Sequence, residues 1–273
     1  MPGPNIRILV AHHKAGPYMV HDAMLPIHVG RALAKAPLPI QGDDTGDHIS
    51  RKNPHYNELT AMYWAWKNLK GVDIVGLTHY RRHFLFDRAP LLCDQVDRNV
   101  DGVTSYQPNM ERILAYLGKH DVILPRPQTL FTFIEAHYKM YHIREDFDLL
   151  TEVLGEMRSE DLDAWKAWTR RSNKLIGHNM FISRWPFFAT YCEWLFPILG
   201  RVEALRKPSP HPYQERALGF MAERLFSFYC SKNTLRIKYL PVLFFTETPK
   251  TRNFSGELRR RVKNDLSVWL CCR

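Results

Sequence analysis

The chain has 273 residues, 45% of them hydrophobic, which is enough to bury the core of one large α/β domain rather than two small ones. No apolar run approaches the ~20 residues that span a bilayer, and the N-terminus lacks the pattern of a signal peptide, so a cytoplasmic protein is expected. The formal net charge of +10 favours polyanionic partners, namely nucleic acid, an anionic lipid surface or nucleotide diphosphates.

The first predicted strand covers residues 6–11 and ends in a polar, cationic triplet, His12, His13 and Lys14. At a strand end this triplet suits a nucleotide contact, with a solvated loop as the equally simple alternative. Residues 24–34 are expected to form a turn and a helix. No glycine-rich phosphate loop follows the strand, which argues against a dinucleotide-binding unit and a Walker-type NTPase.

Residues 37–50 are a loop by composition, because glycine and aspartate supply turn chemistry there. Its carboxylates Asp44 and Asp47 could contact a ribose, a base or a cation, although most such clusters are ordinary turns and caps. Asn53 and Pro54 then predict a helix start, since asparagine can cap a first turn and proline suits the first helical position. Apolar residues at helical spacing continue this helix to residue 69.

Residues 72–78 form a nearly continuous apolar run, typical of a strand buried on both faces. The run delivers His79, Tyr80, Arg81 and Arg82 to the carboxyl end of the strand, where ligands bind in open α/β sheets. Two adjacent arginines suit a phosphate or pyrophosphate, because guanidinium groups match phosphate oxygens and stay charged. The alternative is that the arginines pair with surface carboxylates and that His79 is a satisfied core group.

The sequence resembles the signature of a bacterial family of capsular and exopolysaccharide biosynthesis proteins, long catalogued as a domain of unknown function. The resemblance rests on the runs at residues 42–50, 52–54, 58–60, 63–68 and 79–82. Residues 6–14, 26–30, 179–182, 191–199 and 214–225 fit the same pattern, so the resemblance extends over about residues 6–245. It implies a glycosyltransferase of the A-type, Rossmann-like fold, with a mixed, mostly parallel central sheet flanked by helices in an α/β domain.

By this resemblance the protein would move a hexosyl residue, galactose in its pyranose or furanose form, from a UDP-sugar to a growing capsular, O-antigen or exopolysaccharide acceptor. That acceptor could be lipid-linked. The catalytic candidates are Arg81 and Arg82, with Glu215 and then Glu135 as the general base. The candidate substrate contacts are His12, His13, Lys14, Asp44, Asp47, Asn53, Glu58, Trp64, Lys67, His79, Tyr80, His137, Asn179 and Arg216.

Residues 87–110 look like a variable excursion, and residues 121–125 form another short buried strand. The segment 133–142 is dense in aromatic residues and histidines and either recognises an acceptor sugar, through His137, or packs as a helix. His137 and His142 are five residues apart, so they do not share a helix face as a zinc pair would. Residues 176–182 return to strand character, and residues 187–199 form an apolar helix.

A divalent metal, Mn²⁺ or Mg²⁺, stays open as a cofactor. Two Asp-x-Asp triplets begin at Asp146 and Asp161, but they fall in the predicted helical hairpin 147–168 rather than at a strand end, where A-type transferases hold the ion. Neither triplet is therefore assigned to a metal, and His79 is the weak candidate for a single ligand. The five cysteines lack the spacing of a zinc site.

The chain is expected to divide into a glycosyltransferase domain at residues 1–250 and a basic amphipathic tail at residues 251–273. In the tail, Leu258, Val262, Leu266 and Trp269 share one face while Arg259, Arg260, Arg261 and Lys263 crowd another. Such a helix is typical of a peripheral anchor on an anionic membrane, on the inner face of the cytoplasmic membrane here, although it could equally dock on its own domain.

Two other classes of function compete with a transferase. A nucleic-acid-binding protein would carry a contiguous basic stripe, whereas the positive charge here is spread along the chain and concentrated only in the tail, so no nucleic-acid partner is expected. A non-catalytic carbohydrate-binding protein would bind a saccharide without any nucleotide.

Overall fold

The computed structural model describes residues 3–87, 93–250 and 254–271, with side chains from 255 to 268 in the last segment. The strands are β1 (Ile6–His12), β2 (Met24–His28), β3 (Gln41–Gly42), β4 (Ile74–His79), β5 (Arg82–Phe84), β6 (Gln95–Asn99), β7 (Val122–Pro125), β8 (Gln128–Thr129), β9 (Lys174–Leu175), β10 (Phe181–Arg184), β11 (Ile237–Leu240) and β12 (Val242–Thr246). In the described residues, all but β8 and β9 join one 10-stranded sheet.

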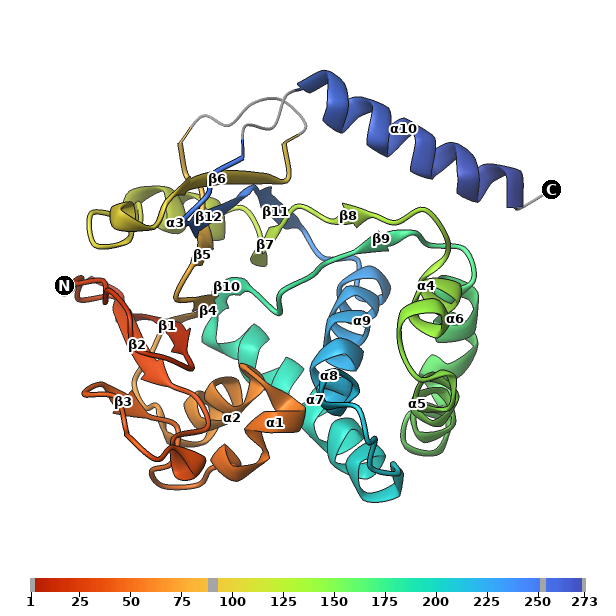
Figure 1. Ribbon diagram of the computed structural model, residues 1–273, viewed down its shortest axis with the longest axis horizontal. Helices are drawn as coiled ribbons and strands as arrows, with labels where there is room; N and C mark the ends of the chain where they lie inside the picture. Colours follow the sequence, from red (N-terminus) through yellow and green to blue (C-terminus); the bar gives the residue numbers. More distant parts are fainter. Residues whose placement is uncertain (1–2, 88–92, 251–253, 272–273) are drawn as a thin grey trace.

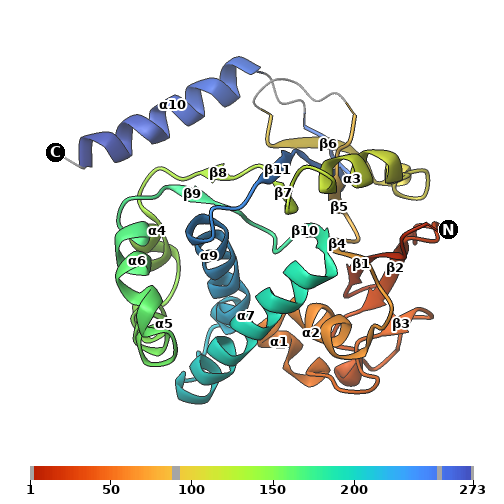
Figure 2. The ribbon, with the colours of Figure 1, turned by 180° about the vertical axis from the view of Figure 1, so that it is seen from behind.

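The path through this sheet is β11-β7-β10-β4-β1-β2-β3, and β5, β12 and β6 branch from β4. Strand β1 is parallel to β2 and β4, β2 to β3, and β7 to β11, whereas β10 is antiparallel to both β4 and β7. Helices flank the sheet (Figures 1 and 2). The mixed, mostly parallel α/β architecture expected from the sequence is thereby confirmed.

The helices are α1 (Asn53–Tyr56), α2 (Leu59–Asn68), α3 (Met110–Leu117), α4 (Ile134–Tyr141), α5 (Arg144–Met157), α6 (Ser159–Thr169), α7 (Trp185–Leu205), α8 (Pro212–Glu215), α9 (Ala217–Lys232) and α10 (Phe254–Cys271). Helices α2, α7 and α9 pack their buried side chains on one face of the sheet, and α3 packs on the other. Helices α4, α5 and α6 stand beside α9 (Figures 1 and 2).

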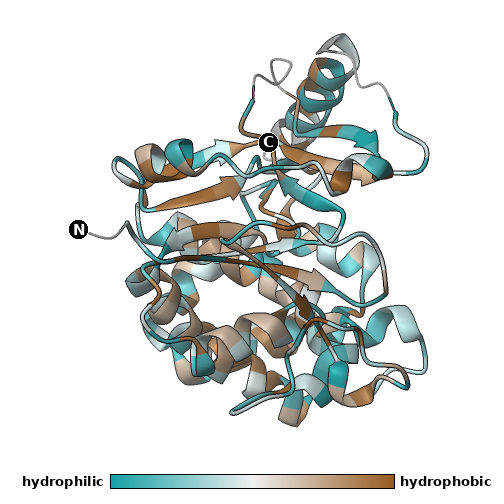
Figure 3. Cartoon of the chain, turned by 90° about the vertical axis from the view of Figure 1, so that its left-hand side faces the viewer, coloured by the Kyte–Doolittle hydropathy of each residue, from teal (hydrophilic) through white to brown (hydrophobic). Residues whose placement is uncertain are grey.

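The continuous apolar runs of the sequence arise because the central strands are covered on both faces. In β4, Val75 and Leu77 join the core under α2, α7 and α9, while Ile74 points into the core under α3. Figure 3 shows these central strands as largely hydrophobic, with helices below them. Gly76 faces the same core as Ile74, and a Cβ there would come 2.9 Å from the backbone oxygen of Phe181, so glycine permits β10 to approach.

The helix predicted from Asn53 to residue 69 is interrupted. Lys52 precedes α1, and Asn53 is its first residue rather than its cap. At Asn57 the backbone turns to φ 51° and ψ −131°, a combination that residues other than glycine rarely adopt, and α2 begins two residues later. The hydrophobic period continues across this break, so the sequence pattern does not reveal it.

Three other expected segments differ from the structure. Residues 24–34 are mainly a strand, since β2 pairs in parallel with β1 from Met24 to His28 and only Arg31–Leu33 forms a 3₁₀ turn. The excursion at 87–110 contains β6 and a 3₁₀ turn, Val100–Val103, while residues 88–92 lie outside the described part. Strand β10 begins at Phe181, after a bend over residues 176–180.

The basic tail forms α10, which lies along one edge of the molecule, away from the layer of α2, α7 and α9 (Figures 1 and 2). Within residues 255–268 it forms hydrogen bonds to the body: Asp265 bonds Asn173 and Lys174, and Asn264 donates to the carbonyl oxygen of Thr129. Val268, near the end of this range, is buried. The side chain of Trp269 lies outside the described residues. No helix in the described residues is both long and apolar enough to cross a membrane.

Candidate functional site

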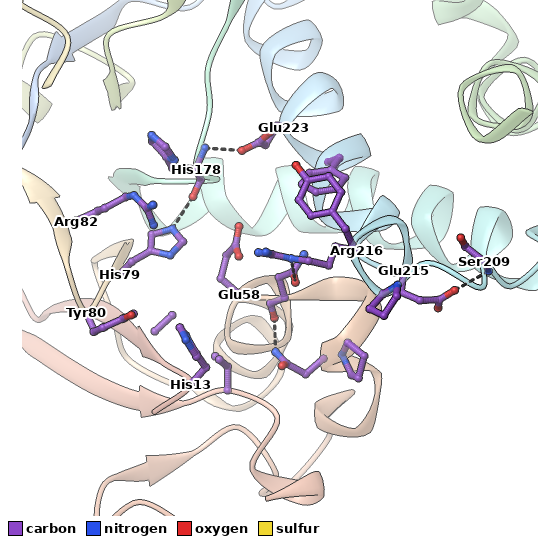
Figure 4. A pocket seen from close by; sticks show the side chains of 18 of the residues that line it. His13, Glu58, His79, Tyr80, Arg82, His178, Ser209, Glu215, Arg216 and Glu223 are labelled. Carbon is purple, nitrogen blue, oxygen red and sulfur yellow. Dashed lines mark hydrogen bonds between the residues drawn. The ribbon is translucent and has the colours of Figure 1, made fainter. Parts of the chain in front are cut away.

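A cavity of about 970 Å³ opens at the carboxyl ends of the parallel strands β1 and β4. Its walls come from six other places: the residue after β2, the start of β5, helix α1 with the α1–α2 junction, the bend before β10, the loop and helix α8 at residues 209–216, and the start of α9 (Figure 4). Ligands bind at this position in open α/β sheets. Residues far apart in the sequence therefore meet where the fold class favours a site.

Strands β4 and β5 form a tight hairpin that explains which arginine faces the cavity. His79 and Arg82 are directly paired across the hairpin, so their side chains share one face of the ribbon, with Tyr80 and Arg81 at the turn between them. His79, Tyr80 and Arg82 line the cavity. Arg81 instead forms an ion pair with Glu247 at 3.0 Å.

Arg82 carries positive charge into a half-buried position. Burial lowers the pKa of its guanidinium, and the carboxylate of Glu58 partly opposes that effect. The guanidinium carbon lies 5.0 Å from the ring centre of Phe244, on the neighbouring strand β12. Among the described residues, no carboxylate comes within ion-pairing distance of Arg82. An anionic ligand would supply the negative charge that the protein does not place beside this guanidinium.

Arg216 brings a second guanidinium to the cavity from the opposite wall (Figure 4). Its Nε donates a hydrogen bond of 2.9 Å to Oδ1 of Asn57, at the break between α1 and α2. Asn57 can lie this close to α9 because residue 219 is glycine: a Cβ there would come 2.2 Å from Nδ2 of Asn57. The break in the helix thus positions an arginine.

The bend before β10 holds two non-glycine residues in the left-handed region, His178 at φ 72° and Asn179 at φ 50°. Cavity side chains fix it from three directions. Glu223 accepts a bond of 2.6 Å from the His178 N–H, Glu58 accepts one of 2.7 Å from Nδ2 of Asn179, and Nε2 of His79 lies 2.7 Å from the His178 carbonyl oxygen. Backbone strain held by the surrounding structure is typical of functional sites.

Two histidines at or beside this bend are disfavoured in their charged form. Burial lowers the pKa of His79, and it lowers the pKa of His178 to about 3, with the charge of Arg82 adding to the effect. Because a carbonyl oxygen only accepts, neutral His79 donates from Nε2, which leaves Nδ1 without its proton. Burial also raises the pKa of Glu223, whose second oxygen accepts a bond of 3.1 Å from Arg224.

The cavity has three carboxylates with different surroundings. Both oxygens of Glu215 are engaged, one 2.9 Å from Nδ1 of His55 and the other accepting 2.6 Å from the Ser209 N–H. Both oxygens of Glu223 are engaged as well. Glu58 receives a hydrogen bond on Oε1 from Asn179, and it lies between Arg82 and Arg216 in Figure 4. Glu58 is therefore the carboxylate best placed to meet a ligand.

The lining of this cavity includes these residues predicted from the sequence: His13, Asn53, Glu58, His79, Tyr80, Arg82, Glu215 and Arg216. Sequence reasoning did not assign Asn57, His178 or Glu223 to the site. Of these three, Glu223 was the easiest to predict from the sequence, because a glutamate beside Arg224 in an otherwise apolar helix indicates a buried polar pair. The positions of Asn57 and His178 depend on backbone turns that no sequence period reports.

Several predicted contacts have other roles in the structure. His12 is buried beneath Tyr80 and Tyr18, with ring centres 5.7 and 5.0 Å apart. Lys14 is exposed, with Nζ 5.9 Å from the Tyr80 ring centre. Asn179 is buried behind the cavity, where it fixes Glu58 as described above.

The loop at residues 42–50 and helix α2 bind each other rather than this cavity. Asp47 accepts a bond of 3.1 Å from the Tyr63 hydroxyl, and Trp64 donates one of 2.8 Å to Oγ1 of Thr45. Asp44 lies 3.9 Å from Arg31, and Nζ of Lys67 stands 3.6 Å from the ring centre of Trp66. Asp47 and Trp64 thus hold the loop against the helix.

The aromatic segment forms α4, apart from the cavity. His137 packs against Tyr141 with ring centres 4.9 Å apart, and burial lowers its pKa to about 4. Glu135 is engaged by Lys139 and Arg170, both at 3.0 Å. The segment thus forms a helix with packed aromatic rings, and acceptor recognition by His137 stays a prediction.

The donor set of the cavity does not fit a divalent metal. The described residues contain no group of three histidine, cysteine, aspartate or glutamate side chains that could hold an ion. The Asp-x-Asp triplets lie in α5 and α6, where Asp146 pairs with Arg206 at 3.0 Å and Asp161 pairs with Lys232. His79 donates from Nε2 to a backbone carbonyl, which leaves Nδ1 as the one ring nitrogen that could bind an ion, and a single nitrogen is too few ligands for a metal site.

Comparison with known proteins places these features in a family. No curated protein matches the chain significantly. A solved structure described as the apo form of WbbM, a bifunctional glycosyltransferase, superposes with a TM-score of 0.80 at 29% identity, covering 90% of this chain. The chain spans 46% of the length of that protein. Residues 7–234 match the family described as "Domain of unknown function (DUF4422)", and the chain belongs to this family.

Proposed function

We propose that the protein is a glycosyltransferase that moves a hexosyl residue from a UDP-sugar to a saccharide acceptor. The observation that carries the proposal is the pair of guanidiniums, Arg82 and Arg216, on two walls of one cavity at the carboxyl ends of β1 and β4. The similarity to WbbM, which is described as a glycosyltransferase, supports it. Galactose, in pyranose or furanose form, is the sugar we propose from the family resemblance.

The diphosphate of the donor would contact both Arg82 and Arg216, with the anomeric carbon between the phosphates and Glu58. Departure of UDP leaves about two negative charges on the leaving group, and fixed cations stabilise the transition state where that charge develops. The two arginines fill this role in our proposal, and no step is assigned to a metal. The sequence suggested Arg81 and Arg82 for this role. We keep Arg82 and leave out Arg81, because Arg81 lies at the hairpin turn and pairs with Glu247.

We propose a direct, inverting displacement with Glu58 as the general base. The acceptor hydroxyl oxygen forms a bond to the anomeric carbon, the bond from that carbon to the β-phosphate oxygen breaks, and UDP leaves with the electron pair. The hydroxyl proton passes to Glu58. Glu58 takes the place of Glu215 in this role, because His55 and Ser209 occupy both oxygens of Glu215.

We place the acceptor in a second cavity of about 290 Å³ that shares His178 with the first. Gln95, Gln128 and Arg126 line it, and their hydrogen-bonding groups suit the hydroxyls of a sugar. A growing polysaccharide, of capsule, O-antigen or exopolysaccharide type, is the acceptor class that we propose from the family resemblance.

A test combines donor binding with turnover. UDP, and UDP-galactose with its sugar in the pyranose or the furanose form, are expected to raise the melting temperature of the wild type by mass action. The UDP-sugar is expected to be consumed when acceptor saccharide is added. Glu58→Gln should lower kcat about 100-fold or more while the donor still binds, because a general base contributes ~10²–10⁴ in rate. Glu215→Gln is the matched control and should keep kcat. Saccharide binding without any response to nucleotides would favour a non-catalytic carbohydrate-binding protein instead.

A further inference from the structure

Helix α10 turns a row of three apolar side chains away from the body, whereas Val268 near its end is buried. Leu258, Val262 and Leu266 are 37%, 48% and 53% exposed, and they follow one another at four-residue spacing along a single face. They line a groove of about 580 Å³ together with Arg259, Lys263 and Ser267, each of which follows one of the three along the chain. The outer face of α10 is therefore an apolar row bordered by cationic side chains.

The opposite face of α10 is fixed to the body, which determines the orientation of the apolar row. Arg260 and Arg261 both pair with Asp94, which is 9% exposed. Further along, Asn264 reaches the backbone of β8, and Asp265 bonds Asn173 and Lys174 beside β9. Apart from the buried Val268, the helix thus docks through polar side chains, whereas a surface helix usually docks through its apolar face.

From this orientation we infer that the outer face of α10, Leu258 to Ser267, is a docking surface for an anionic phospholipid membrane. Apolar side chains of such a helix enter the boundary between headgroups and acyl chains, while arginine and lysine beside them meet lipid phosphates. Arg259 and Lys263 are exposed and border the row, and the chain as a whole carries a net charge of +10.

A second copy of the chain fits this face less well. Two such helices packed face to face would bring the Arg259 and Lys263 side chains of both copies together, between two bodies of high positive charge. A nucleic acid would use the cations but leave the apolar row in water. An anionic bilayer is complementary to both features at once.

The inference places the acceptor cavity next to the membrane. Arg260, on the inner side of α10, lines the 290 Å³ cavity with Gln128 and His178. An acceptor held in the bilayer by a lipid would thus reach that cavity past the anchored helix. Membrane docking itself does not depend on this route or on glycosyl transfer.

The test is cosedimentation of the full chain with vesicles of phosphatidylcholine alone or mixed with phosphatidylglycerol, at low and high salt. The wild type is expected to bind the mixed vesicles, more weakly at high salt. Arg259→Gln with Lys263→Gln should weaken binding about 25-fold, since each cation near an anionic surface is worth about fivefold. Removing the same charge elsewhere, by Lys35→Gln with Lys70→Gln, should weaken it far less.

Leu258→Asn, Val262→Asn and Leu266→Asn together should weaken binding at least about tenfold, since burial of the row in the bilayer is lost. The control alters exposed apolar side chains elsewhere, Val20→Asn, Leu33→Asn and Leu205→Asn, and should bind as the wild type does. Circular dichroism checks that each variant is folded. The inference fails if the wild type does not bind mixed vesicles, or if the variant with the three apolar substitutions binds them as the wild type does. It also fails if light scattering shows that the wild type is a dimer and that these substitutions alone make it a monomer, because the apolar row would then be a dimer interface.

Discussion

Arg81 and Arg82 are adjacent in the sequence, yet they face different surroundings. A two-residue turn sets Arg82 opposite His79 on the cavity side and leaves Arg81 beside Glu247. The sequence correctly predicts that a buried strand carries positive charge to the edge of the sheet. It could not separate the two arginines, because that depends on the hairpin, and the strand β5 is too short to be recognised by its period.

Arg82→Ala is expected to lower kcat/KM by about 30- to 1000-fold, the equivalent of ~2–4 kcal/mol of lost transition-state stabilisation. Arg82→Lys should recover only part of this, because an ammonium group cannot match two phosphate oxygens at once. Arg81→Ala is the control and should stay within about threefold of the wild type. Steady-state kinetics with UDP-sugar measure all three, and an Arg81→Ala defect as large as that of Arg82→Ala would contradict the assignment.

His12 illustrates how a polar residue at a strand end can serve the core. It is 1% exposed, and neither ring nitrogen has a hydrogen-bond partner within the described residues. Burial lowers its pKa from 6.5 to about 4, with the charges of His13 and His28 adding smaller effects. The unfolded chain therefore binds a proton more readily than the folded protein as the pH falls below 6.5.

The free energy of unfolding is accordingly expected to fall with decreasing pH, and His12 should contribute about 2 kcal/mol of that loss by pH ~5. His12→Phe keeps an aromatic ring beside Tyr18 and Tyr80 and should be less sensitive to acid by this amount. His211→Gln changes an exposed histidine and should retain the wild-type pH dependence. Urea unfolding at neutral and mildly acidic pH provides the measurement, and equal slopes for His12→Phe and the wild type would disprove the effect.

At the scale of elements, the sequence predicts the central strands, the hairpin of α5 and α6, and the long helix α7. Each has either a continuous apolar run or a sustained helical period. The sequence-based prediction fails at residues 24–34, where pairing with β1 stabilises a strand. It also fails at Asn57, where one residue interrupts the helix although the hydrophobic period continues. Tertiary contacts outweigh local preference in both places.

Gly219→Ala tests the contact between α9 and the α1–α2 junction. The new methyl group would displace the Asn57 side chain and so break its bond to Arg216, although alanine by itself favours a helix by ~1 kcal/mol. We expect the KM for UDP-sugar to rise severalfold with little loss of stability. Gly200→Ala, in α7, meets open space and should raise stability without altering kinetics. An unchanged KM in Gly219→Ala would show that Asn57 does not position Arg216.

At the scale of the whole molecule, Asp94 joins the C-terminal helix to the body through Arg260 and Arg261. Asp94→Asn should therefore increase hydrogen exchange of the α10 amides at least about fivefold, as expected for the loss of ~1 kcal/mol. Exchange in β1 and β4 should not change. Asp163→Asn, which alters an exposed carboxylate on α6, is the control. Equal α10 exchange in Asp94→Asn and the wild type would rule out this role for Asp94.

The sequence indicated the fold class and a number of the residues that line the cavity, because those properties depend on hydrophobic pattern and motif. It could not show which residues form the wall of the cavity that faces Arg82. Arg216, Glu223 and His178 are more than 90 positions from Arg82, and only the pairing of β10 with β4 and the packing of α9 on the sheet bring them to it. The choice of general base depends on the same long-range contacts.

The family match ends at residue 234, but the sheet continues. Strand β11 pairs with β7, and β12 supports β5 on the side away from β4, with Phe244 opposite Arg82. A protein shortened to the matched region would bare the backbone hydrogen-bonding groups of β7 and β5, and open strand edges invite intermolecular pairing and precipitation. The smallest well-behaved fragment therefore has to reach at least Thr246, beyond the boundary that sequence similarity alone would suggest.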